Sequence, residues 1–242
     1  MGLYRVEAVV LRTWRLGESD RIVNLLTPGR GKVRAVVKGV RKTKSRFGSR
    51  LEPMVHVSLL LYEGRELDIV TQAETIEVFR PVREDLDRLG KATSLLEAVD
   101  QVAQEGHANA RLYQMLLGAL RALAAHDAPL LVPAFFLKLL AVEGFHPMLD
   151  ACAVCGSADD LVAFAQVVGG VLCRACAGGV GGSVALSVDG LALVRRILGG
   201  DLATARNSPP GPATAEVARL ATRALEGHLE RRLRSVGVIP TA

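Results

Sequence analysis

Aromatic side chains and long apolar runs are both scarce in this sequence. Phe, Trp and Tyr make up 4% of its 242 residues. The most apolar segment, Leu130 to Val142, is shorter than the roughly 20 residues that cross a bilayer, and it contains Pro133 and Lys138. Charged residues interrupt the apolar runs near the N-terminus before they reach the length of a signal peptide. We therefore expect a soluble, cytoplasmic protein without a membrane segment.

Motifs that cradle nucleotides or perform hydrolysis are also missing. The chain has no G-x-x-x-x-G-K-[ST] phosphate loop, no G-x-S-x-G nucleophile turn and no H-E-x-x-H zinc pair. Its five histidines are scattered, and no acidic or nucleophilic motif surrounds any of them. The sequence thus names no catalytic residue, and we expect a protein that is not an enzyme.

Acidic residues are absent from one N-terminal stretch, Gly29 to Arg50. Residues 1–50 carry thirteen basic and three acidic side chains, whereas the remainder carries seventeen and twenty-two. A cationic module beside an acidic remainder is typical of a surface that binds phosphate backbones, because each neutralised phosphate releases condensed counterions. The alternative is a solvated, flexible basic loop that binds nothing. The basic residues of the stretch are Arg30, Lys32, Arg34, Lys38, Arg41, Lys42, Lys44, Arg46 and Arg50.

Three aromatic residues accompany this basic stretch. Phe47 lies inside it, and Trp14 and Tyr4 precede it. Aromatic rings among cations can stack on unpaired bases, and each stack contributes on the order of 1–3 kcal/mol. Single aromatic residues are more often part of a core, so Phe47 alone does not decide between the two roles.

Residues 1–80 show the two-residue period of short strands, broken by turns rich in glycine. Five short strands predict a small closed barrel, and the OB-fold is the five-stranded barrel that binds single-stranded nucleic acid. An SH3-like barrel remains the alternative. The expected strands cover residues 3–14, 22–26, 32–37, 55–61 and 67–71.

The period changes to that of helices near Pro81. Ser187 is the expected N-cap of one helix. Arg231, Arg232 and Arg234 are expected at the C-terminal end of the last helix, where cations suit the helix dipole. Together with Arg219 and Arg223 they form either a solvated face or an extension of the nucleic-acid surface. The expected helices cover residues 82–104, 112–123, 130–142, 191–198 and 213–234.

Four cysteines form two C-x-x-C pairs separated by seventeen residues: Cys152, Cys155, Cys173 and Cys176. This spacing predicts a zinc ribbon, because two tight turns can direct four thiolates at one ion. Gly156 permits the first turn, and Gly169–Gly170 can turn a hairpin between the pairs. Four thiolates close the coordination sphere, so we expect one structural Zn²⁺. The alternatives are a redox dithiol and, for His146, a role as an additional ligand.

The motifs, in their order along the chain, resemble the RecO family of bacterial recombination mediator and DNA repair proteins. The resemblance is dense through residue 80, weaker through the helices, and dense again beside the second cysteine pair. The segments that carry it are Ala8–Arg12, Gly17–Val23, Gly31–Lys32, Val37–Lys42, Ser45–Gly48, Leu51–Pro53, Leu60–Gly64, Thr71–Glu74 and Gly169–Cys173.

The resemblance implies an OB-fold that binds single- and double-stranded DNA, anneals complementary strands, and helps to load RecA onto strands covered by single-strand binding protein. It implies RecR, often RecF, and the acidic C-terminal tail of single-strand binding protein as partners, in the cytoplasm at the nucleoid. Some members of the family lack the cysteines, which agrees with a structural metal. Carried over by position, DNA contacts would fall on Lys32, Arg34, Lys38, Arg41, Lys42, Lys44 and Arg46.

We therefore expect an α+β multidomain protein. Residues 1–80 would form the OB-fold barrel, and residues 81–242 a helical domain interrupted by the zinc ribbon at about 148–180. Two other functions compete with strand annealing. One is a zinc-stabilised adaptor that recruits RecR and binds DNA incidentally. The other is a transcription or translation factor that uses the barrel and the ribbon on RNA.

Overall fold

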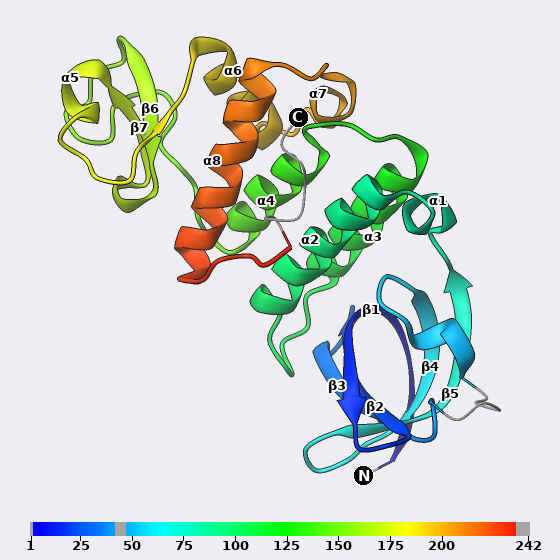
Figure 1. Ribbon diagram of the computed structural model, residues 1–242. Coiled ribbons are helices and arrows are strands. Elements are labelled where there is room, and N and C mark those ends of the chain that lie inside the picture. The colour runs from blue at the N-terminus through cyan, green and yellow to red at the C-terminus, as the bar shows by residue number, and fades with distance from the viewer. Residues whose placement is uncertain (1, 42–46, 236–242) are drawn as a thin grey trace. The chain divides into compact units, whose positions relative to one another are not determined.

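The computed structural model describes residues 2–41 and 47–235 (Figure 1). The described residues divide into two compact units, one within residues 2–124 and the other within residues 125–235. The first unit contains a barrel and the helices that follow it, and the second contains the remaining helices and the four cysteines. The domain boundary near residue 80 stays a prediction.

Five strands form the closed barrel of the first unit (Figure 1). Their order around the barrel is β1-β2-β3-β5-β4, with β1 paired to both β2 and β4. Only β3 and β5 pair in parallel among the described strands of the barrel. This OB-like barrel confirms the expected fold. The strands are β1 (Leu3–Leu16), β2 (Asp20–Thr27), β3 (Gly31–Val37), β4 (His56–Tyr62) and β5 (Asp68–Glu77).

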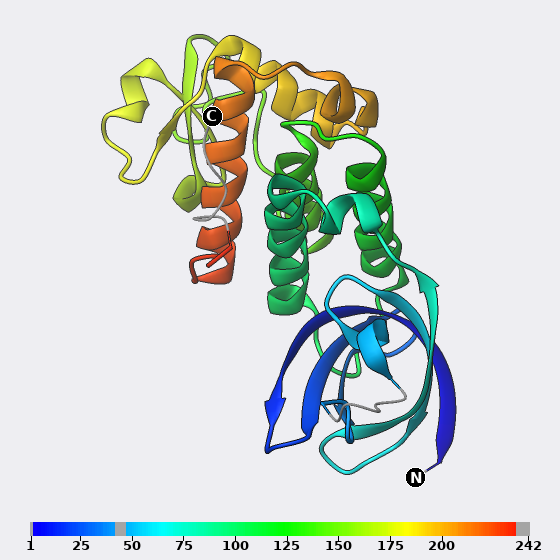
Figure 2. The same cartoon turned by 45° about the vertical axis from the view of Figure 1, so that its right-hand side comes forward.

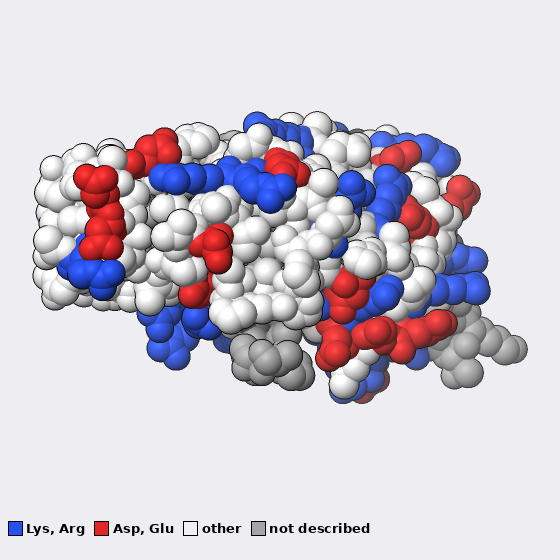
Figure 3. Space-filling view, turned by 90° about the horizontal axis from the view of Figure 1, so that it is seen from above, with Lys and Arg blue, Asp and Glu red and all other residues white. Residues whose placement is uncertain are grey.

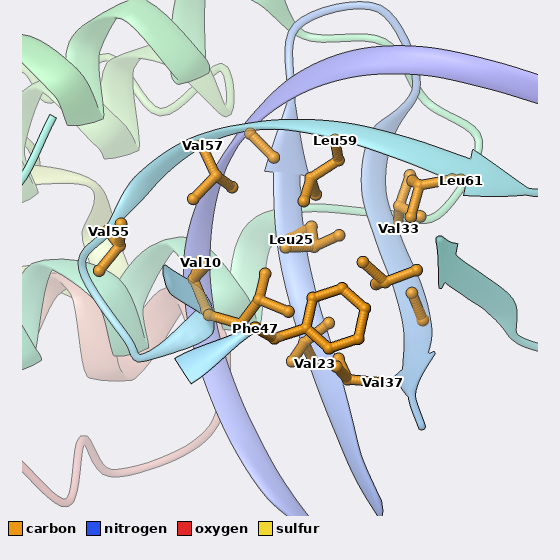
Figure 4. Close-up of a cluster of buried hydrophobic side chains, with 14 residues drawn as sticks. Val10, Val23, Leu25, Val33, Val37, Phe47, Val55, Val57, Leu59 and Leu61 are labelled. Atoms are coloured by element: carbon orange, nitrogen blue, oxygen red, sulfur yellow. The ribbon is translucent and has the colours of Figure 1, made fainter. Parts of the chain in front are cut away.

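The barrel is filled by aliphatic side chains that alternate with outward-facing ones along each strand. Figure 4 shows Phe47 directed into this cluster beside Val23 and Val37. Phe47 directly precedes the short 3₁₀-helix η1 (Gly48–Leu51) and is 2% exposed. Burial of so large a ring stabilises the barrel, and it also removes the ring from any base. Of the two roles considered for Phe47, the core role is therefore confirmed.

Three helices complete the first unit: α1 (Arg80–Arg83), α2 (Leu86–Val102) and α3 (Ala110–Ala125). The single helix expected over 82–104 is divided at Asp85. The side chain of Asp85 accepts hydrogen bonds from the amides of Asp87 at 2.9 Å and Arg88 at 3.0 Å, so it caps a new helix. The apolar period continues across this break, which is why the period alone did not reveal it.

The second unit is built around α4 (Leu131–Val142), which is buried on nearly every side, as its composition predicts. It packs against α6 (Val188–Leu198), α7 (Leu202–Asn207) and α8 (Pro212–Leu229). Ser187 caps α6 as expected, since its hydroxyl accepts a hydrogen bond from the Gly190 amide at 3.1 Å.

The last helix ends earlier than expected. Glu230 adopts a left-handed conformation with φ of 51°, which stops α8 at Leu229. Arg231, Arg232 and Arg234 therefore follow the helix instead of forming its last turn, and the predicted interaction with the helix dipole is wrong for them.

The cysteine-containing region is built on a small three-stranded sheet of order β7-β6-β8, which Figure 2 shows beside α8. Cys152 and Cys155 precede this sheet, Cys173 ends β7, and Cys176 lies in α5. The expected hairpin is present, with the 3₁₀-helix η2 (Gln166–Val168) and Gly169 at its tip. No helix among residues 2–41 and 47–235 has the length and apolar character that a membrane crossing requires. The sheet and its short helix consist of β6 (Leu161–Ala165), β7 (Gly170–Cys173), α5 (Arg174–Ala177) and β8 (Val184–Ala185).

Candidate nucleic-acid interface and metal centre

The outward-facing residues of β1, β2 and β3 form two groups. We call the group around Val9 and Leu26 the covered half, and the group around Trp14, Ile22 and Val36 the free half. In the covered half, Val9 and Leu26 alternate with core residues, so they face outward, yet both are fully buried. α2 packs on β1 there. In the free half, Trp14 is paired with Ile22, and Ile22 with Val36.

A buried polar contact joins the barrel to α2. The Nδ2 amide of Asn24 donates to Oδ1 of Asp100 at 2.7 Å. The Lys32 ammonium donates to the backbone oxygen of Asp100 at 2.5 Å and lies 3.6 Å from its carboxylate. Two uncompensated charges would be costly at such depth, so each partner stabilises the other. Lys32 is therefore engaged within its own chain.

The chain returns to the barrel in the segment after α2. The Lys32 amide donates to the Gln104 oxygen at 3.0 Å, and Gly31 has a φ of 63°. A Cβ at position 31 would lie 2.1 Å from the backbone oxygen of His107. Only glycine permits this approach, since real Cβ contacts are much longer and the backbone there cannot withdraw without losing its hydrogen bond.

The other predicted DNA contacts lie toward the free half. Arg34 is 3.7 Å from Glu105, and its side chain is 40% exposed. Lys38, at the end of β3, and Arg41 are both exposed. The Arg41 guanidinium donates to the Glu18 backbone oxygen at 2.8 Å, which holds it against the β1–β2 turn. Lys42, Lys44 and Arg46 lie outside the described residues.

Two residues of this surface were not among the predicted contacts. Arg12 is exposed on β1, and its guanidinium carbon lies 5.9 Å from the centre of the Trp14 ring. The shift in register between Val10 and Arg12 reverses the alternation there, so a simple two-residue count assigns Arg12 and Trp14 to the wrong face.

A second cation–aromatic pair lies on the barrel, and its ring is already occupied. The Arg30 guanidinium sits 3.9 Å from the centre of the Tyr4 ring and 3.3 Å from Glu63. The Tyr4 hydroxyl donates to Asp68. Burial and the bond to Asp68 raise the pKa of Tyr4 above its usual range, so the hydroxyl stays protonated. Arg30 therefore already covers one face of the Tyr4 ring, which makes this ring less suited to stack on a base.

A buried histidine lies where the barrel meets α3. His56 is 4% exposed, and its Nε2 is 2.7 Å from the Tyr113 hydroxyl. Its Nδ1 is buried without a hydrogen-bond partner. Burial lowers the pKa of His56, and burial raises the pKa of Tyr113 to about 12. The pair is consequently neutral near pH 7.

The four cysteines come together at one end of the small sheet. Their sulfur atoms all lie within 4.8 Å of one another, and the Cys155 and Cys173 sulfurs are 3.6 Å apart. Four thiolates around one Zn²⁺ at about 2.3 Å would be separated by about 3.8 Å, so the arrangement fits a tetrahedral ion. Cys152 and Cys173 are buried, whereas Cys155 is exposed.

Backbone turns and hydrogen bonds hold the cysteines of this cluster in position. Gly156, with a φ of 78°, donates its amide to the Cys152 oxygen at 2.8 Å and closes the first turn. Backbone amides of Cys173 and Cys155 lower the pKa of the Cys152 thiol to about 6. Hydrogen bonds to the Cys155 and Cys173 sulfurs raise the pKa of Cys176 to about 12. His146 is exposed and lies outside the ligand groups found among the described residues.

The arginines near the C-terminal end do not stand in a uniformly basic region. Residues 125–237 carry ten basic and ten acidic side chains. On the face of the molecule seen in Figure 3, Lys and Arg are interspersed with Asp and Glu. Arg195 and Arg196, for example, lie 3.3 Å from Asp150 and 2.8 Å from Asp201. The strongest excess of positive charge in the sequence therefore belongs to the barrel.

Comparison with known proteins gives a consistent result over the whole chain. The family model described as Recombination protein O N terminal matches residues 1–79, and the model described as Recombination protein O C terminal matches residues 83–236.

Curated relatives match from end to end. A protein of Nocardioides named DNA repair protein RecO is 44% identical, with 98% of this chain and 99% of the relative covered. One of the same name from Thermobifida fusca is 42% identical, with both chains fully covered. A third, from Streptomyces griseus, is 41% identical, with 98% of each covered.

Proposed function

The chain belongs to the RecO family of DNA repair proteins, and from this premise we propose that it works on DNA without being an enzyme. It binds single- and double-stranded DNA, anneals complementary strands, and helps to load RecA onto strands covered by single-strand binding protein. The observation that carries this proposal is the cationic end of the OB-like barrel, where Lys38 and Arg41 of the basic stretch are exposed.

Annealing requires two polyanions to approach each other. Cations that neutralise phosphates lower the mutual repulsion of the strands and release their counterions. The proposed phosphate contacts are Arg34, Lys38 and Arg41, together with Lys42, Lys44 and Arg46. We leave Lys32 out of this set, because its ammonium is held by Asp100 and is 17% exposed.

The cysteine cluster supports a structural ion. We propose that Cys152, Cys155, Cys173 and Cys176 bind one Zn²⁺ and that the ion stabilises the ribbon. Four ligands leave no position for water or substrate, so the ion takes no part in chemistry. The redox alternative needs a reactive pair at the start of a helix, and Cys173 and Cys176 do lie at the start of the four-residue helix α5. The convergence of all four sulfur atoms within 4.8 Å of one another favours a bound ion over a single redox pair.

The proposed protein partners follow from the family alone. They are RecR, RecF, the C-terminal tail of single-strand binding protein, and RecA indirectly. The described surface does not assign residues to RecF, to that tail or to RecA.

A specific observation favours a second function, that of an adaptor. Met148, Val154 and Val167 project from the ribbon region with exposed fractions of 51%, 54% and 76%. Apolar side chains exposed to this degree suit a protein contact. In this reading the ribbon recruits RecR, and DNA binding by the barrel is incidental.

Annealing of complementary, dye-labelled strands separates the two functions. The strands are first coated with single-strand binding protein, and no nucleotide is added. Acceleration by the chain supports the annealing function, and binding to the coated strands without acceleration supports the adaptor. Parallel binding to single-stranded DNA, duplex DNA and RNA of equal length tests the third possibility, since a transcription or translation factor would prefer RNA.

A further inference from the structure

We propose that the free half of the outer barrel surface holds a base-stacking site for single-stranded DNA, centred on Trp14. The inference rests on the proposed DNA binding and deepens it, because it separates the reading of unpaired bases from the neutralisation of phosphates. The site consists of Trp14, Ile22 and Val36, flanked by Arg12, Arg34 and Lys38.

The strand register places these residues side by side. Trp14 on β1 is opposite Ile22 on β2, and Ile22 is opposite Val36 on β3. Their sequence neighbours Val23, Ala35 and Val37 belong to the barrel core. Successive side chains of a strand point to opposite faces, so the three apolar residues form one row on the outer face. Trp14 and Val36 are half-buried and Ile22 is 7% exposed, so the accessible part of the row is formed by Trp14 and Val36 with Ile22 between them.

The row is bordered by cations. Arg12 lies at the Trp14 ring, 5.9 Å from its centre, and Arg34 follows one pair further along the sheet. Lys38 is exposed at the opposite border. An aromatic and aliphatic strip between cations suits a DNA single strand, whose bases have apolar faces and whose backbone is anionic.

The acidic residues at this surface already have partners. Asp20 accepts a hydrogen bond from the Gly39 amide at 2.7 Å. Glu105 lies 3.7 Å from Arg34, and Asp100 is held by Asn24 and Lys32. The negative charge bordering the row is thus partly compensated within the chain.

Other rings of the described barrel are less suited to stacking on a base. The ring of Tyr4 is covered by Arg30, and Phe47 is buried in the core. Tyr62 is 41% exposed beside Leu3, but it lies on β4, away from Trp14. The segment that begins with Tyr62 and ends at residue 77 carries five acidic residues and one basic residue. Tyr62 is therefore a matched control, since it is an exposed aromatic residue of the barrel outside the basic surface.

Trp14 is the only tryptophan of the chain, so its fluorescence reports on the proposed site without any substitution. We would titrate the full-length protein with oligothymidylate and with a duplex, and follow fluorescence together with the anisotropy of labelled DNA. A stacked base should quench the tryptophan in step with binding of the single strand. Duplex bases already stack on one another, so the duplex should bind without comparable quenching.

Trp14→Ala should weaken single-strand binding about 5- to 150-fold, the factor that corresponds to one lost stack. It should leave duplex binding and the salt slope of single-strand binding unchanged, because no phosphate contact is removed. Trp14→Phe should restore part of the affinity, and Tyr62→Ala should resemble the native chain. Melting temperatures show whether each variant is folded.

Three outcomes would overturn the inference. One is binding of the single strand by the native chain without quenching. Another is a folded Trp14→Leu variant with native affinity for single strands. The third is no DNA binding by the native chain at all, which would contradict the proposed function as well. The first two leave the proposed function intact, so the two failures are distinguishable.

Discussion

At the scale of the residue, the first unit buries a polar pair, His56 and Tyr113, in addition to its apolar core. His56 shows the consequence for pH. Burial lowers its pKa in the folded chain, with Glu7 and Glu77 opposing and Arg121 adding to the shift. The folded chain keeps His56 neutral at a pH where an unfolded histidine, with a pKa of about 6.5, already binds a proton.

Stability should therefore fall as the pH is lowered through about 6.5, because the unfolded state then binds more protons than the folded state. The loss should continue down to the lowered pKa of the folded chain. Melting temperatures of the native chain and of His56→Gln, taken between pH 7.5 and 5.5, measure this difference. The native chain should lose more stability over that interval.

His126→Gln provides the control, since His126 is exposed. It should show the same pH dependence as the native chain. Equal pH dependence for all three proteins would contradict a role of His56.

Residue patterns also show why sequence reasoning found some contacts and missed others. The cysteines were identified by spacing alone, because a ligand set needs only two turns and a hairpin. Lys32 was predicted to contact DNA together with its basic neighbours. Its partner Asp100 lies far along the chain, so no local sequence pattern indicates that the two residues pair. The sequence indicated Trp14 among the rings that can stack on bases but gave no sign of its neighbour Arg12, because the register shift on β1 that turns both outward is set by strand pairing and leaves no local signal.

At the scale of the element, the ribbon is too small to build a large core of its own. Its buried cluster consists of Ala163, Ala165 and Leu172 with the buried cysteines. Such a small cluster gives little hydrophobic stabilisation, so a bound ion should supply much of the stability of this element.

We expect Cys155→Ser to lose the bound ion and to lower the melting temperature by several degrees, since each kcal/mol of lost stability lowers it by about 2–4 °C in a chain of this size. The measurement is the zinc content of the purified protein together with its thermal melting. DNA binding measured well below the melting temperature should be nearly unchanged.

Val154→Ser introduces the same side chain at the neighbouring exposed position and serves as the control. Native zinc content and melting temperature in the Cys155→Ser variant would contradict the structural role of the ion.

Some helix boundaries could be predicted from the local sequence, and others could not. Ser187 was identified as a cap from its residue type and the apolar period after it, and the structure confirms this. The break at Asp85 and the end of α8 at Glu230 depend on single backbone angles and side-chain bonds within continuous apolar periods. The period describes which face is buried and carries little information about where a helix ends.

At the scale of the whole molecule, charge is distributed unevenly along the chain, and this distribution should govern binding to DNA. Lys38→Glu combined with Arg41→Glu should weaken binding to DNA of any sequence. For single strands the slope of log K against log salt should become shallower by about 1.4, because each lost phosphate contact contributes about 0.7.

Arg219→Glu combined with Arg223→Glu makes the same change of charge on α8. This pair should leave the slope near its native value if the barrel is the contact surface. An unchanged slope in the barrel variant with a shallower slope in the α8 variant would move the site to the second unit.

The burial of Val9 and Leu26 on the outside of the barrel, together with the packing of α2 on β1, also affects how the chain can be exchanged between proteins. A barrel transplanted without α2 would carry an apolar strip on its exterior and an orphaned Lys32. The glycine at position 31 would also lose the backbone that it accommodates. A gene segment that encodes the five strands together with α2 should therefore give a folded product in a new protein more often than a segment that encodes the barrel alone.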